Sequence, residues 1–234
     1  MATIQAYSRP STLYRYRSLT GETIEREIAA VTSGHIFCPT YHEMNDPMEG
    51  SHRESVLLKG SRSYEKMLAK VQSCLRSFGI ASLSEALYHE PMWAHYAGNF
   101  SGMCVAYSMR SLLSNLPNDC ELVRVAYSEK PPIIVRSMQS AEDRAKMILS
   151  NKALRWAGER EWRLISPARG AVRYKVLSTV QKVYLGSRTS KEHTDTILEA
   201  LAKHKISVRK MRLNSYEVSF ESAAPNVRRK PVKN

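Results

Sequence analysis

The sequence predicts an α+β fold in which a mixed or antiparallel sheet forms the core and helices flank it. Short alternating segments typical of strands, amphipathic segments typical of helices, and the irregular order of the two lead to this prediction. A doubly wound parallel sheet would require regular alternation of strand and helix, which the chain does not show. The 43% hydrophobic content and the mean hydropathy of −0.39 suit a globular chain.

The first fifty residues predict a strand, a helix, a second strand and a loop. Tyrosine and arginine alternate between Leu13 and Arg17, a pattern typical of a strand. Apolar residues four and three apart over residues 21–31 predict a helix that Gly34 ends, and residues 35–39 form the next strand. Residues 41–50 are expected to be a loop, because the Asn-Asp-Pro sequence within them favours a turn.

The remaining elements follow from the same patterns. Helices are predicted from apolar stripes, and from a proline at the start of the second one, over residues 63–78, 91–96, 141–157 and 190–204. Strands are predicted from short apolar or alternating runs over residues 79–84, 102–107, 122–127, 161–165, 180–185, 208–213 and 216–220. Strands therefore occur singly in the first half and cluster toward the end.

A single domain is expected over residues 1–222. No internal repeat and no Gly/Ser linker divides this stretch. Residues 223–234 are expected to be a basic, flexible tail, because four cationic side chains and prolines fall there: Arg228, Arg229, Lys230 and Lys233.

The charge balance points to an anionic partner. Lysine and arginine total 35 against 22 acids, a formal net charge of +13. Such a chain attracts polyanions, so DNA, RNA or another anionic substrate is expected as a partner. A basic but functionless surface is the alternative.

A cytoplasmic location is expected from three features of the sequence. No segment is long and apolar enough to span a membrane, and the N-terminus lacks a signal pattern. The four cysteines, Cys38, Cys74, Cys104 and Cys120, form no C-x-x-C motif and are expected to be buried thiols. We expect no membrane association.

Glu159 and Glu161 are the first candidates for catalytic residues. On an extended segment residues two apart point the same way, so both carboxylates would share a face. Two carboxylates held close shift each other's pKa values apart, so one accepts a proton while the other stabilises positive charge. The alternative is a solvated strand face on which Arg160 and Arg163 pair with the acids.

Two further strands carry polar pairs. Ser82 and Ser84 would project from one face, where hydroxyls bind sugars or amides, or else face solvent. Arg15 and Arg17 would also share a face, and guanidiniums that point into a cleft need a phosphate or a carboxylate. If that face is solvated, the arginines indicate no function.

Several acids surround Asn45 and Asp46. The expected structure is an Asn-Asp-Pro turn whose side chains hold their own loop, with a loop that covers a ligand as the alternative. Pro47 excludes the helix that a zinc-protease motif requires, so no metal is expected. A metal-dependent hydrolase or nuclease that uses Glu43, Asp46 and Glu49 remains a further alternative.

Residues 91–96 place two aromatic rings and an imidazole on one short helix. Met92 and Tyr96 are four apart and expected to face the core, which leaves Trp93 or His95 nearer a surface. Trp93, His95 and Tyr96 are candidates for ligand contact, with packing in the core as the alternative. The chain has no Gly-rich dinucleotide motif, Walker motif or zinc-finger spacing.

Four sequence blocks in order resemble a bacterial family known as domain of unknown function 2971. The blocks are the strand at 13–17, the segment 37–49 with its Asn-Asp-Pro-x-Glu sequence, the segment 92–105, and Glu-Trp-Arg-Leu at 161–164. The resemblance covers roughly residues 13–186. This family implies no activity.

The chain also resembles ADP-ribosyltransferases, through Arg15 or Arg17, then Ser82-Leu83-Ser84, then Glu159-Arg160-Glu161. This resemblance implies the split sheet of those enzymes and NAD as a substrate. It differs from the family in the aromatic-rich loop before the glutamates, which is only Trp156-Ala157-Gly158 here.

The resemblance also implies roles for these residues. Arg15 would hold the pyrophosphate or the nicotinamide ribose, and the two serines would fix the ribose. Glu161 would bind the ribose 2′-hydroxyl and stabilise the oxocarbenium-like centre as nicotinamide departs, and Glu159 would orient or deprotonate the acceptor.

The function expected from the sequence is thus transfer of ADP-ribose from NAD to a nucleic-acid or protein acceptor. A toxin or phage-defence setting is expected with it, in which an antitoxin or regulatory protein would be a partner. The alternative from another class is a non-catalytic basic module that binds nucleic acid.

Overall fold

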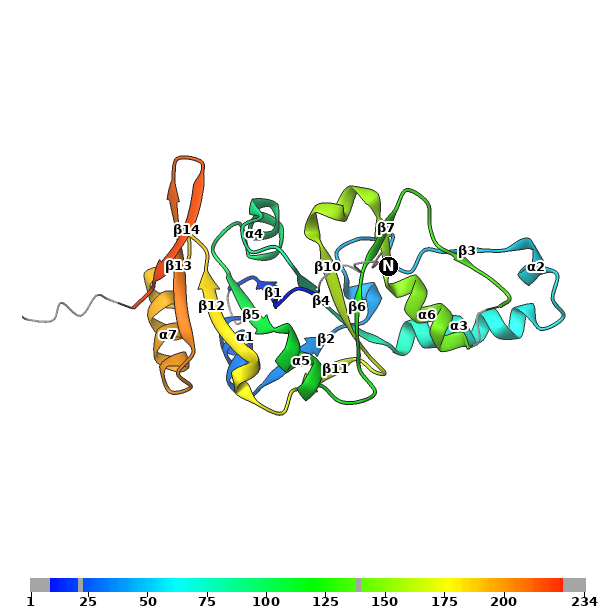
Figure 1. The fold of residues 1–234 in the computed structure, drawn as a ribbon, viewed down its shortest axis with the longest axis horizontal. Coiled ribbons are helices and arrows are strands. Elements are labelled where there is room, and N and C mark those ends of the chain that lie inside the picture. The colour runs from blue at the N-terminus through cyan, green and yellow to red at the C-terminus, as the bar shows by residue number, and fades with distance from the viewer. Residues whose placement is uncertain (1–8, 21–22, 138–139, 225–234) are drawn as a thin grey trace, which may run out of the picture. The chain divides into compact units, whose positions relative to one another are not determined.

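The computed structural model describes residues 9–20, 23–137 and 140–224 (Figure 1). The chain forms two compact units, each built from three separate stretches. Unit 1 comprises residues 1–15, 34–87 and 108–179, and unit 2 comprises residues 16–33, 88–107 and 180–234. Residues 225–234 of the expected tail lie outside the described residues.

The predicted α+β class is confirmed, with mixed strand directions. In unit 1 the strands run in the order β1 (Thr12–Arg17, of which the first four residues belong to this unit), β4 (Gly79–Ser84), β10 (Glu161–Ser166) and β6 (Glu121–Arg124), and the pairs are antiparallel. In unit 2 the order is β5 (Met103–Ser108), β12 (Val180–Leu185), β13 (Ser207–Asn214) and β14 (Glu217–Ser222). The β12–β13 pair is parallel and its neighbours are antiparallel.

Unit 1 also contains three two-stranded ladders. They are β2 (His35–Cys38) with β11 (Gly170–Arg173), β3 (Arg53–Glu54) with β8 (Ile133–Ile134), and β7 (Ala126–Ser128) with β9 (Asn151–Ala153). The expected strand over 122–127 is therefore two strands, β6 and β7, because Ala126 leaves the β10 edge to pair with β9.

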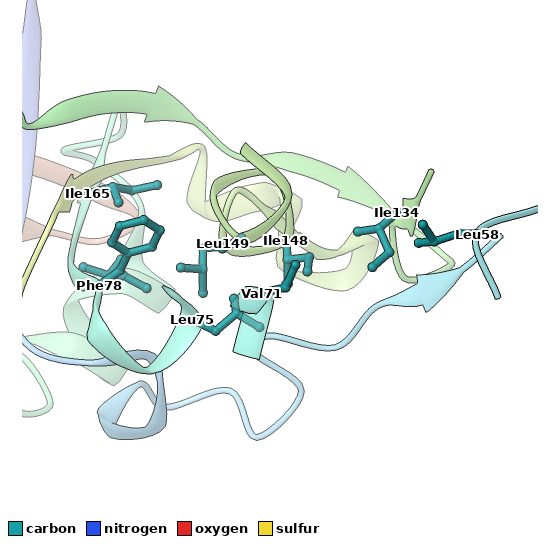
Figure 2. Packing of buried hydrophobic residues seen from close by; sticks show 10 residues of the cluster. Leu58, Val71, Leu75, Phe78, Ile134, Ile148, Leu149 and Ile165 are labelled. Atoms are coloured by element: carbon teal, nitrogen blue, oxygen red, sulfur yellow. The ribbon is translucent and has the colours of Figure 1, made fainter. Parts of the chain in front are cut away.

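Helices α3 (Tyr64–Ser77) and α6 (Ala141–Leu149) pack over one end of the unit 1 sheet. Val71 and Leu75 of α3 point toward Ile148 of α6, and Ile165 of β10 closes the same cluster (Figure 2). Burial of such aliphatic side chains stabilises the unit by about 1.5–3 kcal/mol each. The other helical segments of this unit are α2 (Val56–Lys59), α5 (Met109–Asn115) and three 3₁₀ turns, η1 (Tyr41–Glu43), η2 (Leu154–Glu159) and η3 (Leu177–Thr179).

The predicted helix over 141–157 is wrong beyond residue 149. The Asn151 side-chain amide donates to the Met147 carbonyl at 2.6 Å and caps the helix end. Residues 151–153 then form β9, whose backbone groups pair with β7, so the chain exchanges helical hydrogen bonds for ladder bonds.

Unit 2 holds α1 (Thr23–Thr32), α4 (Glu90–Tyr96) and α7 (Lys191–Ala202). Its core includes an aromatic group in which Trp93 meets the rings of Tyr16 and Phe220 at centroid distances of 5.2 and 5.8 Å. No helix in the described part of the chain has the length and apolarity to cross a bilayer.

The cysteines are buried in two cases and half-buried in two. Cys38 and Cys104 lie in the core as expected, and burial raises the pKa of the Cys38 thiol to about 12. Cys74 and Cys120 are only half-buried, so the expectation of a buried thiol is wrong for these two.

Candidate functional site

The register of β4 and β10 brings the serine pair and Glu161 to one face of the unit 1 sheet. Ser84 lies opposite Glu161, and Ser82 lies opposite Arg163. Directly opposed residues of an antiparallel pair project to the same side, so the hydroxyls, the carboxylate and the guanidinium share this face. The expectation that Ser82 and Ser84 share a face is confirmed.

Glu161 accepts hydrogen bonds from four donors. Ser82 Oγ donates to Oε1 at 2.6 Å, and Lys152 Nζ lies 3.2 Å from Oε2. Arg163 donates to both oxygens through Nε at 2.8 Å and Nη2 at 3.2 Å. Glu161 is 3% exposed, so these donors replace the water that an ionised carboxylate needs.

A second carboxylate completes the pairing of Arg163. Glu49 receives Arg163 Nη1 at 2.8 Å on one oxygen and Nη2 at 2.6 Å on the other. The guanidinium also donates to the Leu149 carbonyl at 2.6 Å and is completely buried. Arg163 is therefore fixed between Glu49 and Glu161 in a planar, multidentate arrangement.

Glu159 reaches the same cluster by a different backbone path from the one predicted. The strand begins at Glu161, while Glu159 ends η2, and Arg160 between them is left-handed with φ 47° and ψ 51°. The expectation that both acids lie on one extended segment is therefore wrong. They still converge, because Lys152 Nζ lies 2.6 Å from Glu159 Oε2 as well as contacting Glu161.

The two serines have different environments. Ser84 is completely buried, donates to the Glu159 carbonyl at 2.6 Å and accepts from the Ala86 amide, so it holds the turn that carries Glu159. Ser82 is exposed although β4 lies between β1 and β10. Ser82 therefore brings solvent to the edge of the cluster, at the residue whose hydroxyl touches Glu161.

The network keeps both Glu161 and Lys152 charged. Burial alone would raise the pKa of Glu161, but Arg163 and Lys152 outweigh it and hold the pKa below its ordinary value. Burial would likewise lower the pKa of Lys152, but Glu161 and Glu159 raise it above its usual value. Tyr127, whose hydroxyl accepts the Glu161 amide at 2.7 Å, has its pKa raised by burial and stays neutral. Glu161 is thus an anion at neutral pH and a poor proton acceptor.

A cavity of about 260 Å³ lies beside this network in unit 1. Lys152 contributes to its wall, together with Met48 and Ser51 on either side of Glu49 and with Arg155 of η2. The ring of Trp156 lies 4.9 Å from the Lys152 ammonium and restricts it further.

Arg15 and Arg17 do not join this cluster. Tyr14 is the β1 residue opposite Ser84, so alternation directs Arg15 to the other face, where Nη2 donates to the Phe37 carbonyl at 2.7 Å. Arg17 belongs to unit 2 and pairs with Glu27 at 2.6 Å. The resemblance to ADP-ribosyltransferases implies that the arginine strand meets the serines and the glutamates. The strand register instead places Arg15 on the opposite face of the sheet from Ser84 and Glu161.

Asn45 and Asp46 lie in a loop that holds itself. Asp46 is 4% exposed and its Oδ1 accepts the Met48 amide at 3.0 Å, while Asn45 is exposed. The acids of the metal alternative have separate partners: Glu43 pairs with Arg169, and Glu49 with Arg163. No group of three or more ligating side chains occurs within the described ranges.

The aromatic candidates all belong to unit 2. Trp93 is completely buried in the core of that unit, which is the packing alternative, whereas His95 is exposed and Tyr96 half-buried. The His95 and Tyr96 rings lie 6.3 Å apart.

Sequence patterns missed three members of the cluster. Lys152 lies inside the helix predicted over 141–157, and the role considered for Glu49 is that of a metal ligand in the hydrolase alternative. Tyr127 is the last residue of the strand predicted over 122–127, and nothing in that pattern indicates its partner. The Asn151 helix cap was the available signal that Lys152 lies outside a helix.

Comparison with known proteins gives one match. Residues 92–164 match the model of a family described as Protein of unknown function (DUF2971). The resemblance stated from the sequence is confirmed over these residues. The matched stretch contains Lys152, Glu159, Glu161 and Arg163, whereas Ser82 precedes it. No curated protein and no solved structure matches the chain.

Proposed function

We propose that this protein cleaves the nicotinamide–ribose bond of NAD and transfers ADP-ribose to an acceptor. The observation that carries the proposal is the contact of the exposed Ser82 hydroxyl with Glu161, an anionic carboxylate. A carboxylate held ionised beside a solvent-accessible hydroxyl suits stabilisation of a sugar cation.

The proposed step follows from this charge. The C1′–N bond breaks, its electron pair neutralises the pyridinium, and nicotinamide leaves as a neutral base. Glu161 stabilises the positive charge that develops on the ribose and accepts a hydrogen bond from the 2′-hydroxyl in place of Ser82. The acceptor forms the new bond at C1′ and releases its proton to Glu159 or to water.

Lys152 and Arg163 act as positioning residues in this scheme. They hold the Glu161 carboxylate ionised and oriented without entering the reaction. Because they lower the pKa of Glu161, they also keep the carboxylate unprotonated, and therefore negatively charged, while the ribose cation develops. The role of Arg15 in holding pyrophosphate receives no support from this face of the sheet, and we do not include it.

The proposal predicts that Glu161→Gln loses NAD turnover. We expect a fall of about 100- to 1000-fold in nicotinamide release, because the neutral amide no longer stabilises the cation. Ser82→Ala removes one neutral hydrogen bond at an exposed site, so a fall of about tenfold is expected with the fold intact. Chromatography of NAD and nicotinamide after incubation measures both.

Glu27→Gln is the matched control. It also replaces one buried carboxylate that pairs with an arginine, Arg17, but Glu27 belongs to unit 2 and to no part of the network around Glu161. Nicotinamide release should stay near that of the unmodified chain, measured below the melting temperature of each variant. Full turnover in folded Glu161→Gln would end the proposal.

A further inference from the structure

A second hollow of unit 1 lies beside α3. Its volume is about 600 Å³, and it runs between α3 and the start of α6. Four polar side chains of α3 and the residue before it line it: Ser63, Lys66, Lys70 and Ser73. We call this hollow the α3–α6 groove.

The lysines of the α3–α6 groove lack anionic partners. Lys66 and Lys70 are exposed, one turn apart on the same helical face, and neither makes an ion pair with any described residue. Like charges four residues apart on one face of a helix destabilise that helix. A bound polyanion would relieve this repulsion.

The opposite wall is also cationic. Arg144 of α6 is buried, and its guanidinium donates to the main-chain carbonyls of Ser140, Val135 and Arg136. Among the described residues that line the groove, Glu142 is the one acid. The lining of the groove therefore contains more basic than acidic side chains.

The length and the hydroxyls suit a phosphodiester chain. Ser63 to Ser73 spans about 15 Å of helix axis, at 1.5 Å per residue. A nucleic-acid duplex of that length carries roughly nine phosphate charges, and serine and lysine are common donors to phosphate oxygens. Among the described residues that line the groove, none has an aromatic ring on which a base could stack.

We infer that the α3–α6 groove binds the phosphate backbone of a nucleic acid without reading its bases. A nucleic acid fits better than an acidic protein, because the whole chain carries a net charge of +13 and the groove places serine hydroxyls beside lysines, the donors that phosphate oxygens commonly accept from. Binding of a nucleic acid in the groove is independent of the proposed function. The further statement that this nucleic acid is the ADP-ribose acceptor rests on the proposed function.

The test measures binding of the full chain to fluorescent oligonucleotides without NAD. The probes are a 16-base-pair DNA duplex, the same length of single-stranded RNA, and poly-glutamate as competitor. Fluorescence anisotropy is recorded over a range of salt concentrations. The variant is Lys66→Ala with Lys70→Ala, which keeps the helix because alanine has the highest helix propensity.

The matched control is Lys191→Ala at the start of α7 with Lys203→Ala directly after its end. These lysines are also exposed and belong to unit 2, and the double variant removes the same charge. We expect the groove variant to reduce the slope of log affinity against log salt by about 1.8 for duplex DNA, two contacts at 0.9 each. The control should leave the slope within error of the unmodified chain.

Three results would overturn the inference. These are equal losses in both double variants, no binding of either oligonucleotide, or poly-glutamate competing as well as DNA at equal charge. Comparison of the duplex with the single strand identifies which nucleic acid is preferred. Nicotinamide release is measured separately, so loss of nucleic-acid binding by the groove is distinguished from absence of NAD cleavage.

Discussion

At the scale of single residues, the buried network of Glu49, Arg163, Glu161, Lys152 and Glu159 determines the chemistry of unit 1. Each charge has at least one partner within 3.2 Å. Removal of one member from a buried ion pair typically destabilises a protein by about 3–5 kcal/mol, because the other charge stays behind without a partner. The network therefore constrains which substitutions the site tolerates.

The pKa shifts predict a pH window for this stability. The pKa of Glu161 is lowered from its ordinary 4.5, so its contribution is fully present above that value and is lost as the pH falls through the folded pKa. The pKa of Lys152 is raised from 10.5, so its contribution is present below that value and is lost as the pH rises through the folded pKa. Urea unfolding at pH 3 and pH 7 should show a larger loss for the unmodified chain than for Glu161→Gln.

Glu43→Gln is the control for the acid side of that window. Its side chain also has a lowered pKa, about 2, caused first by the Arg169 guanidinium, but it lies exposed at the surface. Solvent screens such a pair, so this variant should keep the pH dependence of the unmodified chain. If Glu43→Gln and Glu161→Gln lost the same stability between pH 7 and pH 3, the buried network would not determine the loss of stability in acid.

At the scale of elements, β4 depends on its first residue. A Cβ on Gly79 would lie 2.5 Å from the Ala168 carbonyl oxygen and 2.9 Å from Cys38, both closer than real contacts allow. The strand that carries Ser82 therefore starts where only glycine fits between neighbouring backbones.

Gly79→Ala should destabilise the protein by about 1–3 kcal/mol, the usual range for overpacking. Gly60→Ala is the control, because its Cβ would meet only the Val56 carbonyl at an ordinary 3.7 Å and its φ of −76° suits any residue. Thermal denaturation of both variants measures the difference. A Gly79 variant as stable as the Gly60 variant would contradict the packing described for this strand.

The elements that the sequence predicted well are those with local signals. The predicted strand over 79–84 matches β4, and the predicted helix over 63–78 matches α3, because alternation and an apolar stripe are local patterns. The predicted helix over 141–157 failed where long-range pairing of β9 with β7 decides the structure. Two-residue strands such as β3 carry no pattern that a single sequence can show.

The candidate site shows the same division. Ser82, Ser84 and Glu161 could be predicted to project from strands, but which strands pair, and in which register, was not predictable. That register also decides that Arg15 lies on the other face. Glu159 joins the cluster through the left-handed turn at Arg160, a backbone conformation uncommon for a residue other than glycine.

At the scale of the whole molecule, the net charge of +13 acts on stability as well as on binding. Like charges repel in the compact state, and salt shortens the range of this repulsion from about 10 Å at 0.1 M to 3 Å at 1 M. The melting temperature should therefore rise with sodium chloride, by about 2–4 °C for each kcal/mol of repulsion removed. A scanning fluorimetry series from 0.05 to 0.5 M, at about pH 7, checks this, and a flat or falling series would contradict it.

The bond between Glu49 and Arg163 joins residues 114 positions apart. A ribosome that adds about 5–20 residues per second makes the carboxylate roughly 6–23 s before its guanidinium exists. Throughout that interval Glu49 lacks the partner that it has in the folded protein. The buried network of unit 1 is therefore completed only after Arg163 has been made.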